Sequence, residues 1–299
     1  MTCNLVITDK LVRLAWQQWS ALGVAGSNAC DTVAIDLEAL LLLTGVVSDF
    51  DPRLRDEALD WCSKCGHLIS KPRLKQLLSA AASETRDAFG EFAGTLGSIA
   101  EVDLPGADKA RALGVRLSGK SQLADLSTPA LFNLRVRAIF GIGARADLLT
   151  ALLGSKLPNW SAPELVHVGY TRRNLAQILD DLAKAEVLRV RRERNQLRYE
   201  WQRRSELEAL VRPLPAHVPR WPALMRLLIG MHCLLSSNCS TPALVAGINA
   251  SKWLASHEQD LLGLSIALPH RSNQPVETWT RFQQWADALV DRAIQGTVG

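Results

Sequence analysis

Residues 161–201 read SAPELVHVGY TRRNLAQILD DLAKAEVLRV RRERNQLRYE W, and this stretch decides the fold of the centre of the chain. Ser161, with Glu164 three residues later, forms the pattern of a capping box and predicts a helix over 162–168. Gly169 is suited to end that helix, because glycine adopts the left-handed backbone at little cost. The stretch therefore begins with a short helix followed by a tight turn.

The residues after this turn predict a second helix and then a hairpin. Thr171 is a good N-cap, and the helix over 172–186 has Leu and Ile residues on its inner face. The segments 187–190 and 197–201 are typical of two strands, joined by a polar turn at 193–196. The order helix, turn, helix, hairpin predicts a winged helix-turn-helix over residues 129–204.

Polar side chains gather at the start of the second helix, where such a fold contacts DNA. The second helix of a helix-turn-helix lies in the major groove with its first residues against base edges. Arginine can pair with guanine, and Asn or Gln with adenine. We expect base or phosphate contacts from Thr171, Arg172, Arg173, Asn174 and Gln177.

The predicted hairpin adds arginines that could reach the flank of the DNA. A strand alternates its faces, so only part of Arg189, Arg191, Arg192, Arg194 and Arg198 can face DNA. Arg192 and Arg194, nearest the tip, are the best candidates. We also expect Tyr170 to reach the DNA backbone through its hydroxyl. The hairpin residues in the predicted DNA-binding site are Arg191, Arg192, Arg194 and Arg198.

The charge of the 299-residue chain is concentrated in this central segment. Residues 129–204 hold 14 Lys/Arg against 7 Asp/Glu, a net charge of +7. Residues 1–128 carry 13 against 16, a net of −3, and residues 205–299 carry 7 against 7. A basic module between two modules of another kind is the distribution expected of a polyanion-binding segment.

Residues 135–201 resemble the winged-helix domains of bacterial ArsR- and MarR-type regulators. The resemblance is carried by Arg135–Ala138, Gly143–Ala146, Ser161–Leu165, Tyr170–Leu175 and Leu182–Leu188. One departure is Glu186, where the family usually has glycine before the first wing strand. The resemblance implies a repressor that binds double-stranded DNA as a homodimer. The cysteine pairs of metal-sensing members are absent from this segment, so metal sensing is not implied.

The whole layout is also similar, more weakly, to large winged-helix proteins encoded beside abortive-infection nucleotidyltransferases. That similarity implies a regulatory or antitoxin-like role in phage defence. From the residues themselves we expect a transcriptional regulator and not an enzyme. The alternative is a protein-interaction adaptor whose winged fold binds a partner protein.

The remainder of the chain predicts helices, so the fold class is mainly α. We expect an N-terminal helical domain over 1–125, the winged helix over 129–204 and a C-terminal helical domain over 205–299. The outer domains are expected to form the dimer or to bind a protein or small-molecule effector. No secretory signal or long apolar run occurs, which predicts a cytoplasmic protein without a membrane partner.

Two other motifs offer different functions. Cys62-Ser63-Lys64-Cys65 after Trp61 is similar to a redox motif, but no strand precedes it, and no second cysteine pair lies nearby for zinc. We expect Cys62 in the core and Cys65 at a helix end, with zinc or redox chemistry as the alternative. Asp36 and Glu38 form a carboxylate pair without a nucleophile, and Asp36 is expected to cap a helix. The sequence predicts no cofactor, no metal and no catalytic residues.

A second small basic patch is formed by Lys71, Arg73 and Lys75. We expect these side chains to lie on a solvated helix face. The alternatives are that they extend the DNA-binding surface or pair with the acidic N-terminal surface.

Overall fold

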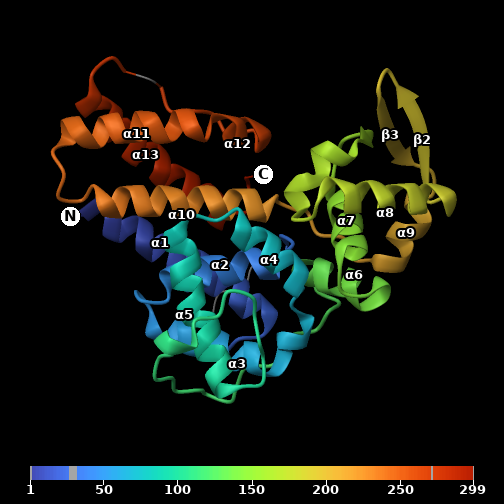
Figure 1. Cartoon of the computed structure of the whole chain (residues 1–299), viewed down its shortest axis with the longest axis horizontal. Coiled ribbons are helices and arrows are strands. Elements are labelled where there is room, and N and C mark those ends of the chain that lie inside the picture. The colour runs from blue at the N-terminus through green and yellow to red at the C-terminus, as the bar shows by residue number, and fades with distance from the viewer. Residues whose placement is uncertain (1, 27–31, 271, 299) are drawn as a thin grey trace.

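The computed structural model describes residues 2–26, 32–270 and 272–298, and it is mainly helical with one three-stranded antiparallel sheet. The apolar side chains form two separate cores. Figure 1 shows the corresponding division, with the sheet and helices α6–α9 beside a larger helical part that contains both termini.

The larger part combines helices from both ends of the chain. Helices α11 and α13 pack on each other, α13 packs on α1, and α10 packs on α2. The expected N- and C-terminal domains therefore share one core and are not two independent units. Its helices are α1 (Thr2–Leu22), α2 (Leu37–Val47), α3 (Pro52–Cys65), α4 (Lys71–Ser79), α5 (Ser83–Ile99), α10 (Trp221–Ser237), α11 (Ala243–Ser256), α12 (Glu258–Gly263) and α13 (Pro275–Ile294).

The smaller part is formed by the central segment of the chain. Its core is closed by Leu175, Ile178, Leu179 and Leu182 on the inner face of α8. Its elements in order are α6 (Phe132–Phe140), α7 (Ala144–Gly154), β1 (Asn159–Trp160), the 3-10 helix η4 (Ala162–Val168), α8 (Arg172–Lys184), β2 (Leu188–Glu193), β3 (Gln196–Trp201) and α9 (Arg204–Val211). The 3-10 turns η1 (Gly66–Leu68), η2 (Lys109–Arg111) and η3 (Pro129–Leu131) lie outside this group.

The sheet has the order β1-β3-β2, with both pairs antiparallel. In the hairpin, Leu188 lies opposite Trp201 and Glu193 lies opposite Gln196, which leaves a two-residue turn. Short β1 joins the far edge of β3, because Trp160 pairs with Tyr199. The hairpin is thereby tied to the segment that precedes η4.

Several helix starts follow the signals in the sequence. Asp36 caps α2 by accepting from the Ala39 N–H, and Asp51 caps α3 with Pro52 in its first turn. Ser161 and Glu164 form the expected capping box at η4. These side chains satisfy amide groups that have no partner inside their own helix.

Three local features complete the smaller part. Trp160 lies in the two-residue strand β1. Helix α9 lies almost wholly within the expected C-terminal domain, but its Val211 belongs to the smaller core. At Gly141 and Gly143, positive φ angles of 84° and 151° separate α6 from α7.

Within the described ranges, no helix is both long enough and apolar enough to cross a membrane.

Candidate nucleic-acid interface

Helix α8 presents its first turn to solvent. Thr171 is the N-cap, and its Oγ1 accepts from the Asn174 N–H at 3.3 Å. The side chains of Arg172, Arg173 and Asn174 are exposed, whereas Leu175 behind them is fully buried. The apolar stripe of the helix therefore fixes which residues face outward.

Not all of the α8 residues expected to contact DNA have free hydrogen-bonding groups. Gln177 is exposed, but its amide donates to Asp181 at 3.0 Å, one turn further along the helix. Arg172 and Arg173 have no ion-pair partner among the residues that the structure describes. The two arginines are thus the most available groups at the start of the helix.

One face of the hairpin holds its arginines in ion pairs. Arg191 lies 3.1 Å from Glu200, and Arg189 lies 3.8 Å from the same carboxylate. Arg198 is only partly exposed and donates to Glu164 at 2.7 Å. These contacts neutralise the charge that the sequence places on this face. Arg191 and Arg198, both predicted to bind DNA, would have to leave their carboxylates to do so.

The opposite face of the hairpin is turned toward α8. Tyr199 lies on this face, and its hydroxyl donates to Asp180 of α8 at 2.5 Å. Arg192 shares the face, since it is paired with Leu197, two residues before Tyr199. Arg194 occupies the turn with a φ of 53°, and both arginines are exposed. In the described part of the chain, neither has a carboxylate partner.

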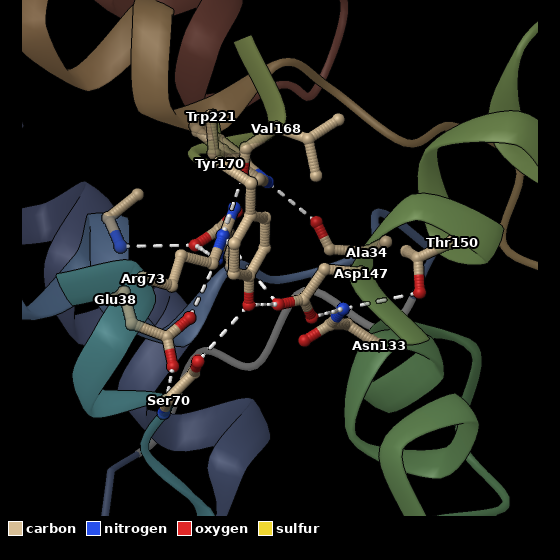
Figure 2. A network of polar contacts seen from close by, with 12 residues as sticks. Ala34, Glu38, Ser70, Arg73, Asn133, Asp147, Thr150, Val168, Tyr170 and Trp221 are labelled. Carbon is tan, nitrogen blue, oxygen red and sulfur yellow. Dashed lines mark hydrogen bonds and ion pairs between the residues drawn. The ribbon is translucent and has the colours of Figure 1, made fainter. Parts of the chain in front are cut away.

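Tyr170, expected to contact the DNA backbone, is buried instead. The residue is only 8% exposed, and its hydroxyl donates to Asp147 at 2.7 Å. The hydroxyl also lies 3.1 Å from Ser70 Oγ (Figure 2). Burial, together with the charge of Asp147, raises the pKa of this phenol. Tyr170 belongs to the interior and is removed from the set of DNA contacts.

Arg73 is also buried, so it lies neither on a solvated helix face nor on the DNA-binding surface, and it pairs with acidic residues of the N-terminal part instead. Its guanidinium donates to Glu38 at 2.6 Å and to both carboxylate oxygens of Asp36. The side chain is neither on a solvated face nor available to DNA. Only its neighbours Lys71 and Lys75 remain exposed.

A second buried arginine completes this group. Arg137 of α6 donates to Glu38 at 2.7 Å and to Asp147 of α7 at 2.8 Å. We call Asp36, Glu38, Arg73, Arg137 and Asp147 the junction cluster, because they join the two cores. Burial raises the pKa of the Asp147 carboxyl, but Arg137 and Arg73 outweigh it and bring the pKa to about 2. The two guanidinium groups therefore keep the buried Asp147 carboxylate ionised at neutral pH.

The junction cluster holds the turn that precedes α8. Arg73 Nε donates to the Val168 carbonyl at 2.7 Å, and Tyr170, two residues later, is bound by Asp147. Gly169 between them has a φ of 97°, and a Cβ there would approach Arg73 Cγ to 3.2 Å. Figure 2 shows Arg73 and Asp147 on either side of Tyr170. The turn before α8 is thus held by Arg73 of the larger part together with Asp147 of α7.

The sequence patterns did not reveal this cluster. Arg137 and Glu38 are 99 residues apart, and Arg73 and Glu38 are 35 apart. No local spacing connects them. The one available sign was that Arg137 lies within a run of apolar helix residues.

The cysteine motif lies in the larger core. Cys62 and Cys65 are buried at the end of α3, and burial raises the pKa of both thiols. Across the described ranges, no group of three or more His, Cys, Asp and Glu side chains is arranged to hold a metal ion. The geometry at Cys62 and Cys65 is that of packed core residues.

No family model, curated protein or solved structure matches the chain.

Proposed function

We propose that the protein is a sequence-specific regulator of transcription that binds double-stranded DNA through a winged helix-turn-helix over residues 129–204. Helix α8 would lie in the major groove, and the β2–β3 hairpin would contact the flanking backbone. Bound to an operator, the protein would repress transcription.

The order of elements supports the winged helix. Helix η4, the turn at Gly169 and helix α8 follow one another as in a helix-turn-helix, and a hairpin comes next. Strand β1, before η4, joins β3 and so fastens the hairpin to the helices. These features favour a DNA-binding module over an arbitrary helical pair.

The observation that carries the proposal is the set of exposed arginines without carboxylate partners. Arg189, Arg191 and Arg198 each face a carboxylate, which competes with any phosphate for the guanidinium. An unpaired guanidinium is free to bind phosphate or the edge of guanine. Among the described residues of α8 and the hairpin, the unpaired arginines are Arg172, Arg173, Arg192 and Arg194.

The proposal includes a homodimer, because one helix reads only a few base pairs and a two-fold pair doubles the site. Four exposed apolar side chains lie where α11 and α13 begin, and the close approach of Gly247 to Pro275 joins these two helix starts. They are Leu244, Val245, Ile248 and Val276, and they supply an apolar surface for a second copy. Light scattering of the full chain tests this: a monomeric mass at about 100 µM would remove the dimer from the proposal.

The direct test is selection of duplexes from a random library, followed by fluorescence anisotropy on the enriched sequence. We expect nanomolar affinity for that duplex and an affinity at least about 1,000-fold weaker for a shuffled one. Equal affinity for both duplexes would contradict sequence reading. Failure to enrich any duplex would favour the alternative, a module that binds another protein.

A further inference from the structure

A cavity of about 270 Å³ lies between the two parts of the molecule. Its walls come from the segment before α2, from α7, from η4 and from the start of α10. The volume is near the lower limit of typical small-molecule sites. A ligand of modest size could therefore fill it.

The side walls of the cavity offer apolar surface. Trp160 and Trp221 line it, and their indole N–H groups are already used inside the protein, on Ser155 and on the Ala34 carbonyl. Leu165 and Val218 add aliphatic surface. Such walls suit a flat ring.

One acceptor in the cavity has no donor among the described residues. His167 Nδ1 lies 2.8 Å from the Glu164 carbonyl, which can only accept, so Nδ1 carries the proton and Nε2 is an acceptor. Burial and then Arg220 lower the pKa of His167 to about 4, so the ring is neutral. Asn133 also borders the cavity, but its amide N–H groups donate to Asp147 and Thr150, and its Oδ1 has almost no accessible surface for a ligand to contact.

The charges around the cavity favour an anion. Lys156 and Arg220 line it, and within the described ranges neither is paired with a carboxylate; Arg220 donates only to the Gly263 carbonyl, at 2.9 Å. The three carboxylates of the wall, Asp36, Glu164 and Asp147, already accept from arginines. A cationic ligand would meet two free cations and no free carboxylate.

The geometry points to a binding site for a phosphate monoester of a nitrogen heterocycle, the chemistry of a nucleoside monophosphate. The ring lies against the tryptophan walls and donates an N–H group to His167 Nε2. The dianionic phosphate binds Lys156 and Arg220, since two cations match its charge better than that of a carboxylate.

The same wall is continuous with the turn before α8. Arg73, Asp147 and Val168 line the cavity, and Arg73 and Asp147 hold the turn at Val168 and Tyr170. A ligand that moves this wall changes the position of the first turn of α8. The inference that a bound ligand changes DNA affinity rests on the proposed DNA binding, whereas occupation of the cavity does not.

Isothermal titration calorimetry of the full chain with AMP, GMP, CMP and UMP tests the site without DNA. We expect at least one of them to bind with a Kd below about 1 mM. Its parent nucleoside and inorganic phosphate should each bind about tenfold more weakly or worse, because each lacks half of the contacts. No saturable binding by any of the four, or phosphate binding as tightly as the nucleotide, would overturn the assignment.

Two variants locate the binding site. Lys156→Ala changes an exposed side chain and should weaken the nucleotide about tenfold. Lys252→Ala, which changes another exposed lysine, on α11 and away from the cavity lining, is the control and should leave the affinity unchanged. Equal affinity in wild type and Lys156→Ala would place the nucleotide elsewhere and overturn the assignment.

The effect of the nucleotide on DNA affinity is measured by fluorescence anisotropy on the selected duplex, with and without saturating nucleotide. We expect the duplex affinity to change at least about fivefold. An unchanged affinity would contradict the coupling. If no duplex is bound at all, calorimetry still decides whether the cavity is a nucleotide site.

Discussion

The arginines of the α8–hairpin surface and those of the junction cluster have opposite environments. Arg173 is exposed without a carboxylate partner in the described chain, whereas the Arg137 side chain is 1% exposed and binds two carboxylates. Both lie in the central segment whose net charge is +7. A charge count therefore combines exposed, unpaired arginines with arginines that hold the fold. Only the positions of the carboxylates separate the two groups.

The largest effect is expected from removing a buried arginine. Arg137→Met leaves Glu38 and Asp147 as buried carboxylates with fewer partners. The free energy of unfolding should fall by about 3–5 kcal/mol, measured by urea denaturation. Arg145→Ala, on an exposed residue of α7, is the control and should change it by less than about 0.5 kcal/mol.

A double variant sharpens this test. Glu38→Gln added to Arg137→Met removes the uncompensated charge, so the double variant should be more stable than the sum of the single losses predicts. A loss below about 1 kcal/mol in Arg137→Met would mean that the cluster does not join the two parts as described.

The free energy of unfolding should depend on pH because His167, which is neutral in the folded protein, becomes protonated on unfolding in acid. Burial, with Arg220, lowers its pKa in the folded protein to about 4, while the unfolded value is close to 6.5. The contribution of the neutral ring to the free energy of unfolding is complete above about pH 6.5. Up to about 3 kcal/mol of it is lost as the pH falls toward 4. Urea denaturation of wild type and His167→Gln between these pH values measures it.

His167→Gln should make the free energy of unfolding depend less steeply on pH, without removing the dependence altogether. His232 is also buried, and burial lowers its pKa, so it contributes in the same direction. An identical slope in His167→Gln and wild type would show that His167 does not titrate in this way.

At the exposed surface, the effect should appear in DNA affinity and not in stability. Arg173→Ala should weaken binding to the selected duplex by about 1–3 kcal/mol, by anisotropy, because it removes a guanidinium that can contact a base. Arg189→Ala is the matched control, since this arginine already faces Glu200. Comparable losses in the two variants would break the distinction between free and paired arginines.

The main elements between residues 161 and 201 were predictable, because their signals are local. Thr171, Gly169 and the apolar stripe of α8 define that helix, and β-branched, Leu and aromatic residues on both sides of a polar turn define the hairpin. The junction cluster was not predictable, because Glu38, Arg73 and Arg137 come together only through the packing of distant helices. Strand β1 was missed since two residues are too short to form a pattern. Polar residues that tertiary packing buries, such as Tyr170, look like surface residues in the sequence.

The smallest effect is expected from Tyr170→Phe. The change removes a buried hydroxyl from Asp147 and should cost about 1–2 kcal/mol of stability by urea denaturation. The affinity for the selected duplex should stay within about twofold of wild type, since the hydroxyl faces the interior. A loss of duplex affinity above about tenfold, with stability unchanged, would return Tyr170 to the DNA-binding surface.

The most direct test of the account is the salt dependence of duplex affinity for wild type, Arg192→Ala/Arg194→Ala and Arg189→Ala/Arg191→Ala. Each phosphate contact contributes about −0.9 to the slope of log affinity against log salt. If the unpaired hairpin arginines bind phosphate, the first double variant should have a slope shallower by about 1.8, and the second should differ little from wild type. Equal slopes in wild type and Arg192→Ala/Arg194→Ala would contradict the claim that these free arginines form the DNA-binding surface.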